Sequence, residues 1–238
     1  MIEPESVIPC WRKDWEIGCR NEGLAWWNLL FPPKCPGCNG YVEHQGQWCN
    51  ECLARVCRPH LLPLDREMTE LFLGGIWALG LYEGELRNML RQLKYQQKQV
   101  MVPGLHSLVA EGIGRIPALW ENLVAVPVPL HKEKQAQRGF NQSKLIFQKP
   151  LADYGIATED WLIRTKATKP QYGLSGVQRR KNLHHVFELA GEKSLLGRRI
   201  LLVDDIMTTG ATLLECGRVL KKAGAVDITG LVVASGRK

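Results

Sequence analysis

The sequence predicts an α/β protein, in which a mostly parallel sheet is flanked by helices and a small cysteine-rich module precedes it. Two observations carry this prediction. From residue 85 onward, apolar segments of strand length alternate with segments of helical periodicity, as is typical of parallel sheets with helices on both faces. In contrast, seven of the eight cysteines lie within the first 57 residues, among glycines and prolines. A small metal-stabilised module suits that composition.

Residues 85–98 form the first predicted helix. Leu86, Met89, Leu90 and Leu93 follow the i, i+3, i+4, i+7 spacing of one helical face. The basic residues of the segment lie off that face: Arg87, Arg91, Lys94 and Lys98. The segment is therefore expected to be an amphipathic helix with a basic outer side.

The remaining elements follow in alternation. Strands are expected at residues 123–128, 161–164 and 185–189, with a helix at 141–154 between the first two. The last unit comprises an apolar strand at 200–203, a helix at 212–225 and a strand at 227–235. In that helix, lysines occupy the last turn and Gly224 stands where a C-terminal cap belongs.

Length and charge limit the classes of protein to consider. The chain has 238 residues and is 45% hydrophobic, enough for one sizeable core. Its net charge is +7, and the first 60 residues hold only 6 of 31 basic against 7 of 24 acidic residues. The larger C-terminal part should therefore prefer an anionic partner. Because the sequence shows neither a long apolar run nor a signal peptide, we expect a cytoplasmic protein without membrane insertion.

The stretch ILLVDDIMTTGAT, residues 200–212, brings a buried strand to two adjacent acids and a hydroxyl-rich turn. In parallel sheets, ligands bind where strands end and helices begin. Backbone N–H groups of the turn, the helix dipole and the threonine hydroxyls suit a phosphate. Asp204 and Asp205 would repel that phosphate, so they should face a neutral hydroxyl-bearing group or a metal. A sugar phosphate meets both demands.

Along all thirteen residues this stretch resembles the phosphoribosyl pyrophosphate (PRPP) motif of type I phosphoribosyltransferases, whereas neither G-x-x-x-x-G-K-[ST] nor a G-x-G-x-x-G after a strand occurs. The resemblance implies that Asp204 and Asp205 contact the ribose hydroxyls. It also implies a 5′-phosphate site made of Thr208, Thr209, Gly210, Ala211 and Thr212. Mg²⁺ would bridge ribose and pyrophosphate oxygens, as suits a hard cation that prefers ligand oxygens and water.

Pyrophosphate departure from C1 of the ribose requires nearby positive charge. Two basic loops, one on each side of the strand expected at 161–164, are predicted to supply it as a flexible hood over the ligand. The residues assigned to this pyrophosphate loop and hood are Pro129, Leu130, His131, Lys134, Arg138, Lys166, Lys169, Gln171, Arg179 and Arg180. Asp204, Asp205 and Arg138 are the residues to which catalysis is assigned.

A narrower resemblance rests on four ordered motifs behind an N-terminal Cys-x-x-Cys pair: YEGELRNMLRQLKY, VPVPLH with RGFNQ, TKPQYGLSGVQRRKNL with VF, and the PRPP motif. Together they resemble the ComF family over residues 29–235, which implies a link to natural competence and DNA uptake. The chain departs from the family pattern at two places. Lys134 and Ala136 replace two arginines before RGFNQ, and Gln96 and Gln97 replace a glycine after LKY.

Two Cys-x-x-Cys knuckles, separated by ten residues, form the cysteine module: Cys35, Cys38, Cys49 and Cys52. Four sulfurs suit a structural Zn²⁺ with no open position. Disulfides or an iron–sulfur cluster are the alternatives. We expect the metal to serve folding, because so short a module cannot bury a sufficient core alone.

The predicted organisation is a poorly ordered lead-in at 1–25, a zinc-ribbon-like module at 26–63, and a domain of the type I phosphoribosyltransferase fold at 75–238. The predicted function is binding of PRPP or a related sugar phosphate with Mg²⁺, with phosphoribosyl transfer to an undefined acceptor. The alternative is a non-catalytic adaptor of DNA uptake that binds single-stranded DNA and uses the fold as a PRPP sensor or scaffold.

Overall fold

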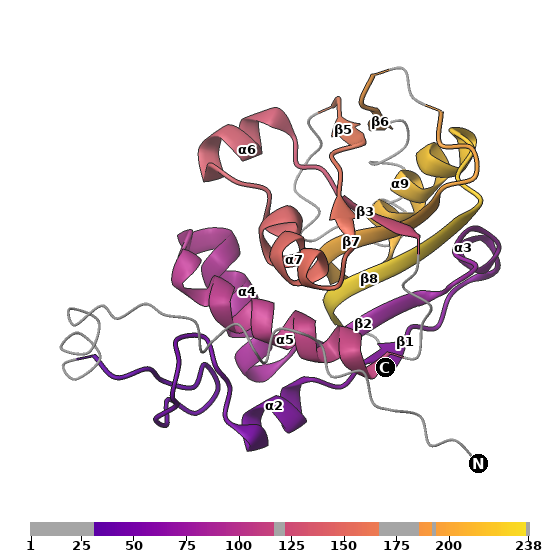
Figure 1. Cartoon of the computed structure of the whole chain (residues 1–238). Helices are drawn as coiled ribbons and strands as arrows, with labels where there is room; N and C mark the ends of the chain where they lie inside the picture. The colour runs from indigo at the N-terminus through magenta and orange to yellow at the C-terminus, as the bar shows by residue number, and fades with distance from the viewer. Residues whose placement is uncertain (1–30, 117–121, 167–185, 192–193, 237–238) are drawn as a thin grey trace, which may run out of the picture.

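The computed structural model describes residues 31–116, 122–166, 186–191 and 194–236. Its centre is a six-stranded sheet in the order β1-β2-β8-β7-β3-β4 (Figure 1). The strands are β1 (His60–Leu61), β2 (Ile76–Leu81), β3 (Leu123–Pro127), β4 (Ala157–Thr158), β7 (Arg199–Met207) and β8 (Asp227–Ser235). Only β1 pairs antiparallel, and all other neighbours are parallel. The prediction of a mostly parallel sheet is confirmed.

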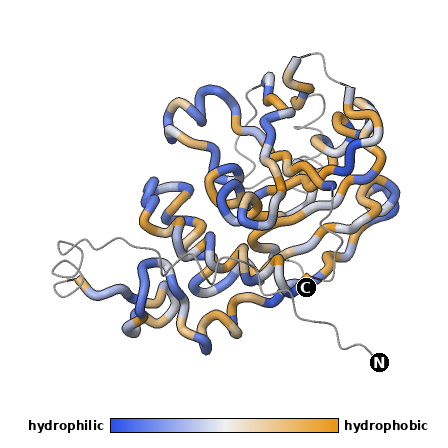
Figure 2. The backbone as a smooth tube through the Cα atoms, viewed as in Figure 1, coloured by the Kyte–Doolittle hydropathy of each residue, from blue (hydrophilic) through white to orange (hydrophobic). Residues whose placement is uncertain are grey.

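Helices cover both faces of this sheet. One core contains Leu201 and Val203 of β7 and packs beneath α4 (Gly84–Gln96), α5 (Val102–Arg115) and α7 (Gln142–Asp153). The other contains Ile200 and Leu202 and packs beneath α3 (Arg66–Leu71) and α9 (Ala211–Lys222). Alternate residues of β7 thus face opposite cores. In Figure 2 the central strands are accordingly hydrophobic and the outer turns of the helices hydrophilic.

Most predicted elements are present within one or two residues. In α4 the four predicted apolar positions are all buried, and β8 has its expected bounds. The structure corrects three expectations. β7 continues past residue 203 to Met207, so both aspartates lie inside the strand. The first basic loop contains a helix, α6 (Lys132–Arg138). The strands β5 (Leu162–Arg164) and β6 (Phe187–Leu189) form a separate antiparallel pair.

The cysteine-rich segment packs directly on the helices of the sheet. Its helix, α2 (Asn50–Val56), and the buried Cys35 and Trp48 belong to the same core as α4 and α5. Trp48 Nε1 donates a hydrogen bond of 2.8 Å to the carbonyl oxygen of Gly104, near the start of α5. The short 3₁₀ helix η2 (Gln99–Met101) joins α4 to α5. Among the described residues, no helix has the length and apolar character needed to cross a membrane.

Candidate functional site

The threonine-rich turn of residues 208–210 joins the end of β7 to the start of α9. Gly210 caps α9 at φ +79°, in the left-handed region. A Cβ atom there would lie 2.7 Å from Cε of Met68 and 2.8 Å from Cε of Met207. Glycine suits this position both because of its left-handed conformation and because these side chains leave no room for a Cβ atom. Thr209 Oγ1 accepts a hydrogen bond of 3.4 Å from the N–H group of Ala211. The turn therefore places hydroxyl groups at a helix N-terminus.

Different helices contact the two carboxylates at the end of β7. Asp204 Oδ1 accepts hydrogen bonds of 2.9 Å from Ser143 Oγ of α7 and from the N–H group of Asp205. Asp205 Oδ2 lies 3.2 Å from Nζ of Lys94, in the last turns of α4. Helices α4 and α7 thus converge on adjacent residues of one strand.

These surroundings raise the pKa of Asp204 to about 7, from its usual 3.8. Burial contributes most, and the negative charge of Asp205 contributes next. The positive charge of Lys94 and the hydrogen bonds from the N–H group of Asp205 and from Ser143 act in the opposite direction. Asp204 therefore gains or loses its proton near neutral pH.

Basic side chains from three elements, α4, α6 and β5, lie near one another. Burial lowers the pKa of Lys134, and three neighbouring positive charges lower it further; they belong to Arg164, Arg138 and Lys94. The i, i+4 spacing of Lys134 and Arg138 puts both on one side of α6, where they are half-buried. Within the described part of the chain, neither has an acidic group at ion-pair distance. The cluster favours an anionic ligand.

Lys134 of the predicted pyrophosphate loop lies near Lys94, the partner of Asp205, and Arg138 lies near Lys134. His131 caps α6, accepting a 3.4 Å hydrogen bond from the N–H group of Glu133, and it pairs with Arg164 of β5 in an isolated bridge. Lys94 and Arg164 were not among the predicted site residues. Four predicted hood residues lie outside the described residues: Lys169, Gln171, Arg179 and Arg180. Lys166 is described, at the end of the segment that follows β5.

A cavity of about 460 Å³ lies between α6, α7 and β5, and Arg164 is among its lining residues. Its lining includes Pro129, Leu130, Phe140 and the ion-paired Lys144 and Asp160. The two aspartates of β7 do not line it. Pro129 and Leu130 are therefore placed at this cavity.

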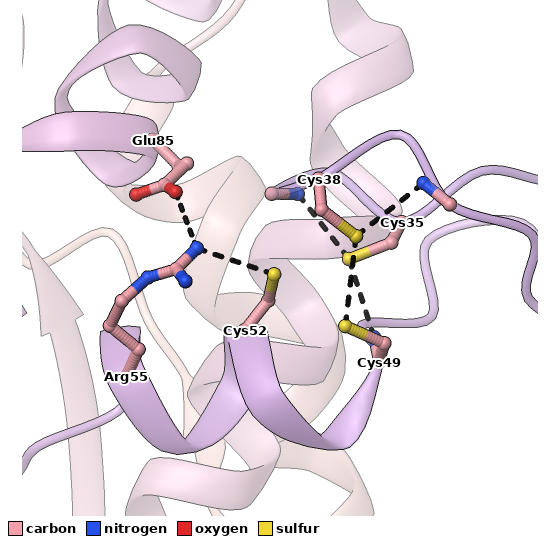
Figure 3. A network of polar contacts seen from close by, with 8 residues as sticks. Cys35, Cys38, Cys49, Cys52, Arg55 and Glu85 are labelled. Carbon is pink, nitrogen blue, oxygen red and sulfur yellow. Dashed lines mark hydrogen bonds and ion pairs between the residues drawn. The ribbon is translucent and has the colours of Figure 1, made fainter.

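The four cysteines of the predicted metal site form a cluster in which all Sγ atoms lie within 4.8 Å of one another. Cys35 Sγ accepts hydrogen bonds from the N–H groups of Gly37 and Cys49, at 3.4 and 3.3 Å. Arg55 connects the cluster to α4, because its Nη2 donates to Cys52 Sγ at 3.3 Å and to Glu85 at 2.6 Å (Figure 3). The arrangement can bind a metal ion such as zinc, for which four thiolates are a suitable ligand set.

The sulfur environments within the cluster differ. Burial raises the pKa of Cys35, but hydrogen bonds from backbone N–H groups outweigh this effect and bring the pKa to about 6. Burial and the neighbouring cysteines raise the pKa of Cys52 to about 12. Without a metal, Cys35 therefore loses its proton easily and Cys52 keeps its proton. Metal binding requires both as thiolates.

Comparison with known proteins places this architecture in a family. The chain is 30% identical over 201 residues to Competence protein F of Haemophilus influenzae. The aligned region covers 82% of each protein. The chain belongs to the ComF family. It is also 30% identical to the DNA utilization protein YhgH of Escherichia coli K12, over 82% of the chain and 80% of that protein. The chain is 25% identical to Competence protein ComFC of Bacillus subtilis, over 83% of the chain and 84% of that protein. Residues 164–238 match the phosphoribosyl transferase domain model.

Two of the ComF motifs quoted above have a structural explanation in this chain. In RGFNQ, Gly139 ends α6 at φ +77°, and Asn141 caps α7 by accepting a hydrogen bond from the N–H group of Lys144. The second position after LKY is also left-handed, because Gln97 ends α4 at φ +53°. A glycine would adopt this conformation without strain. Here the Gln97 side chain instead donates a 3.2 Å hydrogen bond to the carbonyl oxygen of Gln137, joining α4 to α6.

Proposed function

We propose that this ComF-family protein binds PRPP at the end of β7. The proposal rests mainly on one observation: the carboxylates of Asp204 and Asp205 and the turn at Gly210 stand at the same sheet edge, next to the start of α9. This edge is where ligands bind in parallel α/β sheets. A diphosphate that carries a ribose supplies hydroxyls for the carboxylates and a phosphate for the turn.

Each part of the ligand has a chemically suitable counterpart. The two carboxylates would accept hydrogen bonds from the ribose 2′ and 3′ hydroxyls, and the turn of Thr208, Thr209 and Gly210 would hold the 5′-phosphate. Lys134 and Arg138, which lack acidic neighbours among the described residues, would face the pyrophosphate. Mg²⁺ would enter with the ligand, because it favours the oxygens of the diphosphate and of water.

The same arrangement supports a transfer reaction. In that step the bond between C1 of the ribose and the pyrophosphate oxygen breaks, and an acceptor atom forms the new bond to C1. The departing pyrophosphate takes the electron pair, so fixed cations lower its energy. Arg138 and Lys134 would provide this stabilisation without acting as nucleophiles. We infer that the protein acts on sugar phosphates in the cytoplasm.

Calorimetric titration with PRPP and Mg²⁺ tests the proposal. The wild type should bind PRPP in the micromolar range, and the double variant Asp204→Asn, Asp205→Asn should lose binding, because an amide holds a ribose hydroxyl less strongly than a carboxylate. The matched control is Asp153→Asn, which removes an exposed carboxylate at the end of α7. An absence of wild-type binding would overturn the proposal, as would equal binding by the double variant.

We propose in addition that the cysteine cluster holds a structural Zn²⁺. Support comes from the four converging sulfurs, from the N–H groups directed at Cys35, and from the shared core with α5. A closed set of four thiolates leaves no position for a substrate, so the ion would contribute to folding. Metal analysis of purified protein should find one Zn²⁺ per chain, and loss of the metal in a Cys38→Ser variant.

A second candidate function is binding of single-stranded DNA, which one surface favours. Arg87, Arg91 and Tyr95 follow each other at i, i+4, i+8 along the exposed side of α4, and Lys98 lies just beyond. The Tyr95 side chain is 69% exposed. Cations interleaved with an exposed aromatic ring suit a strand whose phosphates need positive charge and whose bases stack.

Fluorescence anisotropy with a labelled single-stranded oligonucleotide tests this candidate at low and moderate salt. The triple variant Arg87→Gln, Arg91→Gln, Lys98→Gln should bind more weakly and with a shallower salt dependence than the wild type. Lys222→Gln, an exposed lysine at the end of α9, is the control. Wild-type affinity in the triple variant would exclude α4 as the contact surface.

A further inference from the structure

Lys94 is a cation that points from a helix into the candidate site. It lies one residue after the buried Leu93 in α4, and only 28% of its side chain is exposed. Its Nζ atom is 3.2 Å from Asp205 Oδ2, and the Asp205 side chain is 9% exposed. Because both groups are largely shielded from water, the electrostatic attraction between them is stronger than in an ion pair on the surface.

One cation serves two carboxylates at this point. Asp204 has no basic group within ion-pair distance among the described residues, and it is held instead by Ser143 and by the N–H group of Asp205. The negative charge of Asp205 raises the pKa of Asp204, and the positive charge of Lys94 lowers it. Lys94 contacts Asp205 through its Oδ2 atom, and the Lys94 charge also acts on Asp204. This leaves Asp205 Oδ1 as an acceptor for a ligand.

Lys94 also marks the boundary between the acidic and basic parts of the site. Its charge acts on Asp205 and Asp204 on one side and on Lys134 on the other. Helix α4 is joined to α6 by the hydrogen bond from Gln97 to Gln137, so the two cationic helices have a fixed relation. A ligand with a ribose at the carboxylates and a diphosphate at α6 would pass beside the ammonium group.

We propose that Lys94 is a positioning residue of the sugar-phosphate site, which orients the Asp205 carboxylate so that its free oxygen receives a ribose hydroxyl. This inference rests on the proposed function. Lys94 would act through Asp205 and not through the pyrophosphate. The charged and titratable groups that face the carboxylate pair are Lys94 of α4, Arg164 of β5 and Cys216 of α9, with Lys134 of α6 beyond Lys94. Among them, only Lys94 lies within ion-pair distance in the described residues.

The test compares Lys94→Met and Lys94→Arg with the wild type, using PRPP with Mg²⁺ in calorimetry and ribose 5-phosphate as a competing ligand. Lys94→Met should weaken the binding of both ligands at neutral pH by a similar factor of about ten or more. A factor of ten corresponds to about 1.4 kcal/mol of binding free energy. Binding should recover at higher pH, because Lys94 lowers the pKa of Asp204 and its loss moves the ionisation of that carboxyl group to higher pH. Lys94→Arg, which keeps the cation, should restore most of the affinity and the wild-type pH profile.

The exposed Lys222→Met is the control, because it makes the same substitution far from the carboxylates. Wild-type binding by Lys94→Met would overturn the inference, and so would a loss confined to PRPP, which would indicate a direct pyrophosphate contact. An equal loss in both Lys94 variants with an unchanged pH profile would indicate packing alone and would also overturn it. If the wild type itself fails to bind PRPP, the proposed function fails, and the role of Lys94 fails with it.

Discussion

Ser143 Oγ donates a 2.9 Å hydrogen bond to Asp204 Oδ1, although 61 residues separate the two in the chain. Ser143 is 4% exposed and lies in the first turn of α7. The bond therefore ties the start of a helix to a carboxylate inside the central strand, three residues before its end. Because the hydroxyl stabilises the ionised form of Asp204, it lowers the pKa of that carboxyl against the effect of burial.

Substitution Ser143→Ala should raise the pKa of Asp204 further and move the pH at which PRPP binds upward. It should also reduce the free energy of unfolding by about 1–2 kcal/mol at pH 8, where Asp204 is ionised, and by less at pH 5.5. Denaturant unfolding at pH 8 and at pH 5.5 measures the two losses of unfolding free energy. Ser107→Ala removes an exposed hydroxyl that donates within α5 and serves as the control. Equal losses at both pH values would contradict the expected role.

The raised pKa of Asp204 also predicts how stability depends on pH. Between about pH 4 and pH 7 the unfolded chain releases this proton while the folded chain keeps it, so folded Asp204 binds more protons. Its contribution to stability is complete below pH 4 and falls as pH rises to about 7, by at most about 1.4 kcal/mol per pH unit. Asp204→Asn should remove that slope, whereas Asp153→Asn should keep it. Thermal unfolding across this pH range provides the measurement.

Gly210→Ala should destabilise the protein more than Gly139→Ala. Both glycines have φ near +78°, at +79° and +77°, so both substitutions cost about 1 kcal/mol of backbone strain. Only at Gly210 does the new Cβ meet other atoms, the methyl groups of Met68 and Met207. The extra loss in denaturant unfolding, together with weaker PRPP binding, would show that the turn must stay close to these side chains. Equal losses would mean that the methionines move aside.

The elements that the sequence predicted depend on apolar spacing, which is local information, whereas β2 and α5 were not predicted. The four buried positions of α4 and the apolar run of β7 follow directly from periodicity. Helix α6 was missed because its polar sequence KEKQAQR has no apolar period, although Gly139 gave a stop signal. The extension of β7 through the aspartates was missed because its pairing with β8 lies in another part of the chain.

The site shows the same limit. Asp204 and Asp205 could be selected from one contiguous motif, whereas Lys94 was assigned to the basic outer side of α4. Its position next to Leu93, at the edge of the apolar face, was the available signal. That it meets Asp205 depends on how α4 packs on the sheet, which no local pattern reports. The same holds for Arg164, which reaches the site from the separate pair of β5 and β6.

Metal removal should loosen the core as well as the cysteine module. Trp48 is 3% exposed, shares the core with Cys35 and donates its indole N–H to Gly104. Chelation, or Cys38→Ser, should therefore change Trp48 fluorescence and lower Tm by about 10 °C, as for several kcal/mol of lost metal binding. Cys57→Ala is the control, since this buried thiol lies outside the cluster. If the Cys57 variant lost the metal and Cys38→Ser kept it, the assigned ligand set would be wrong.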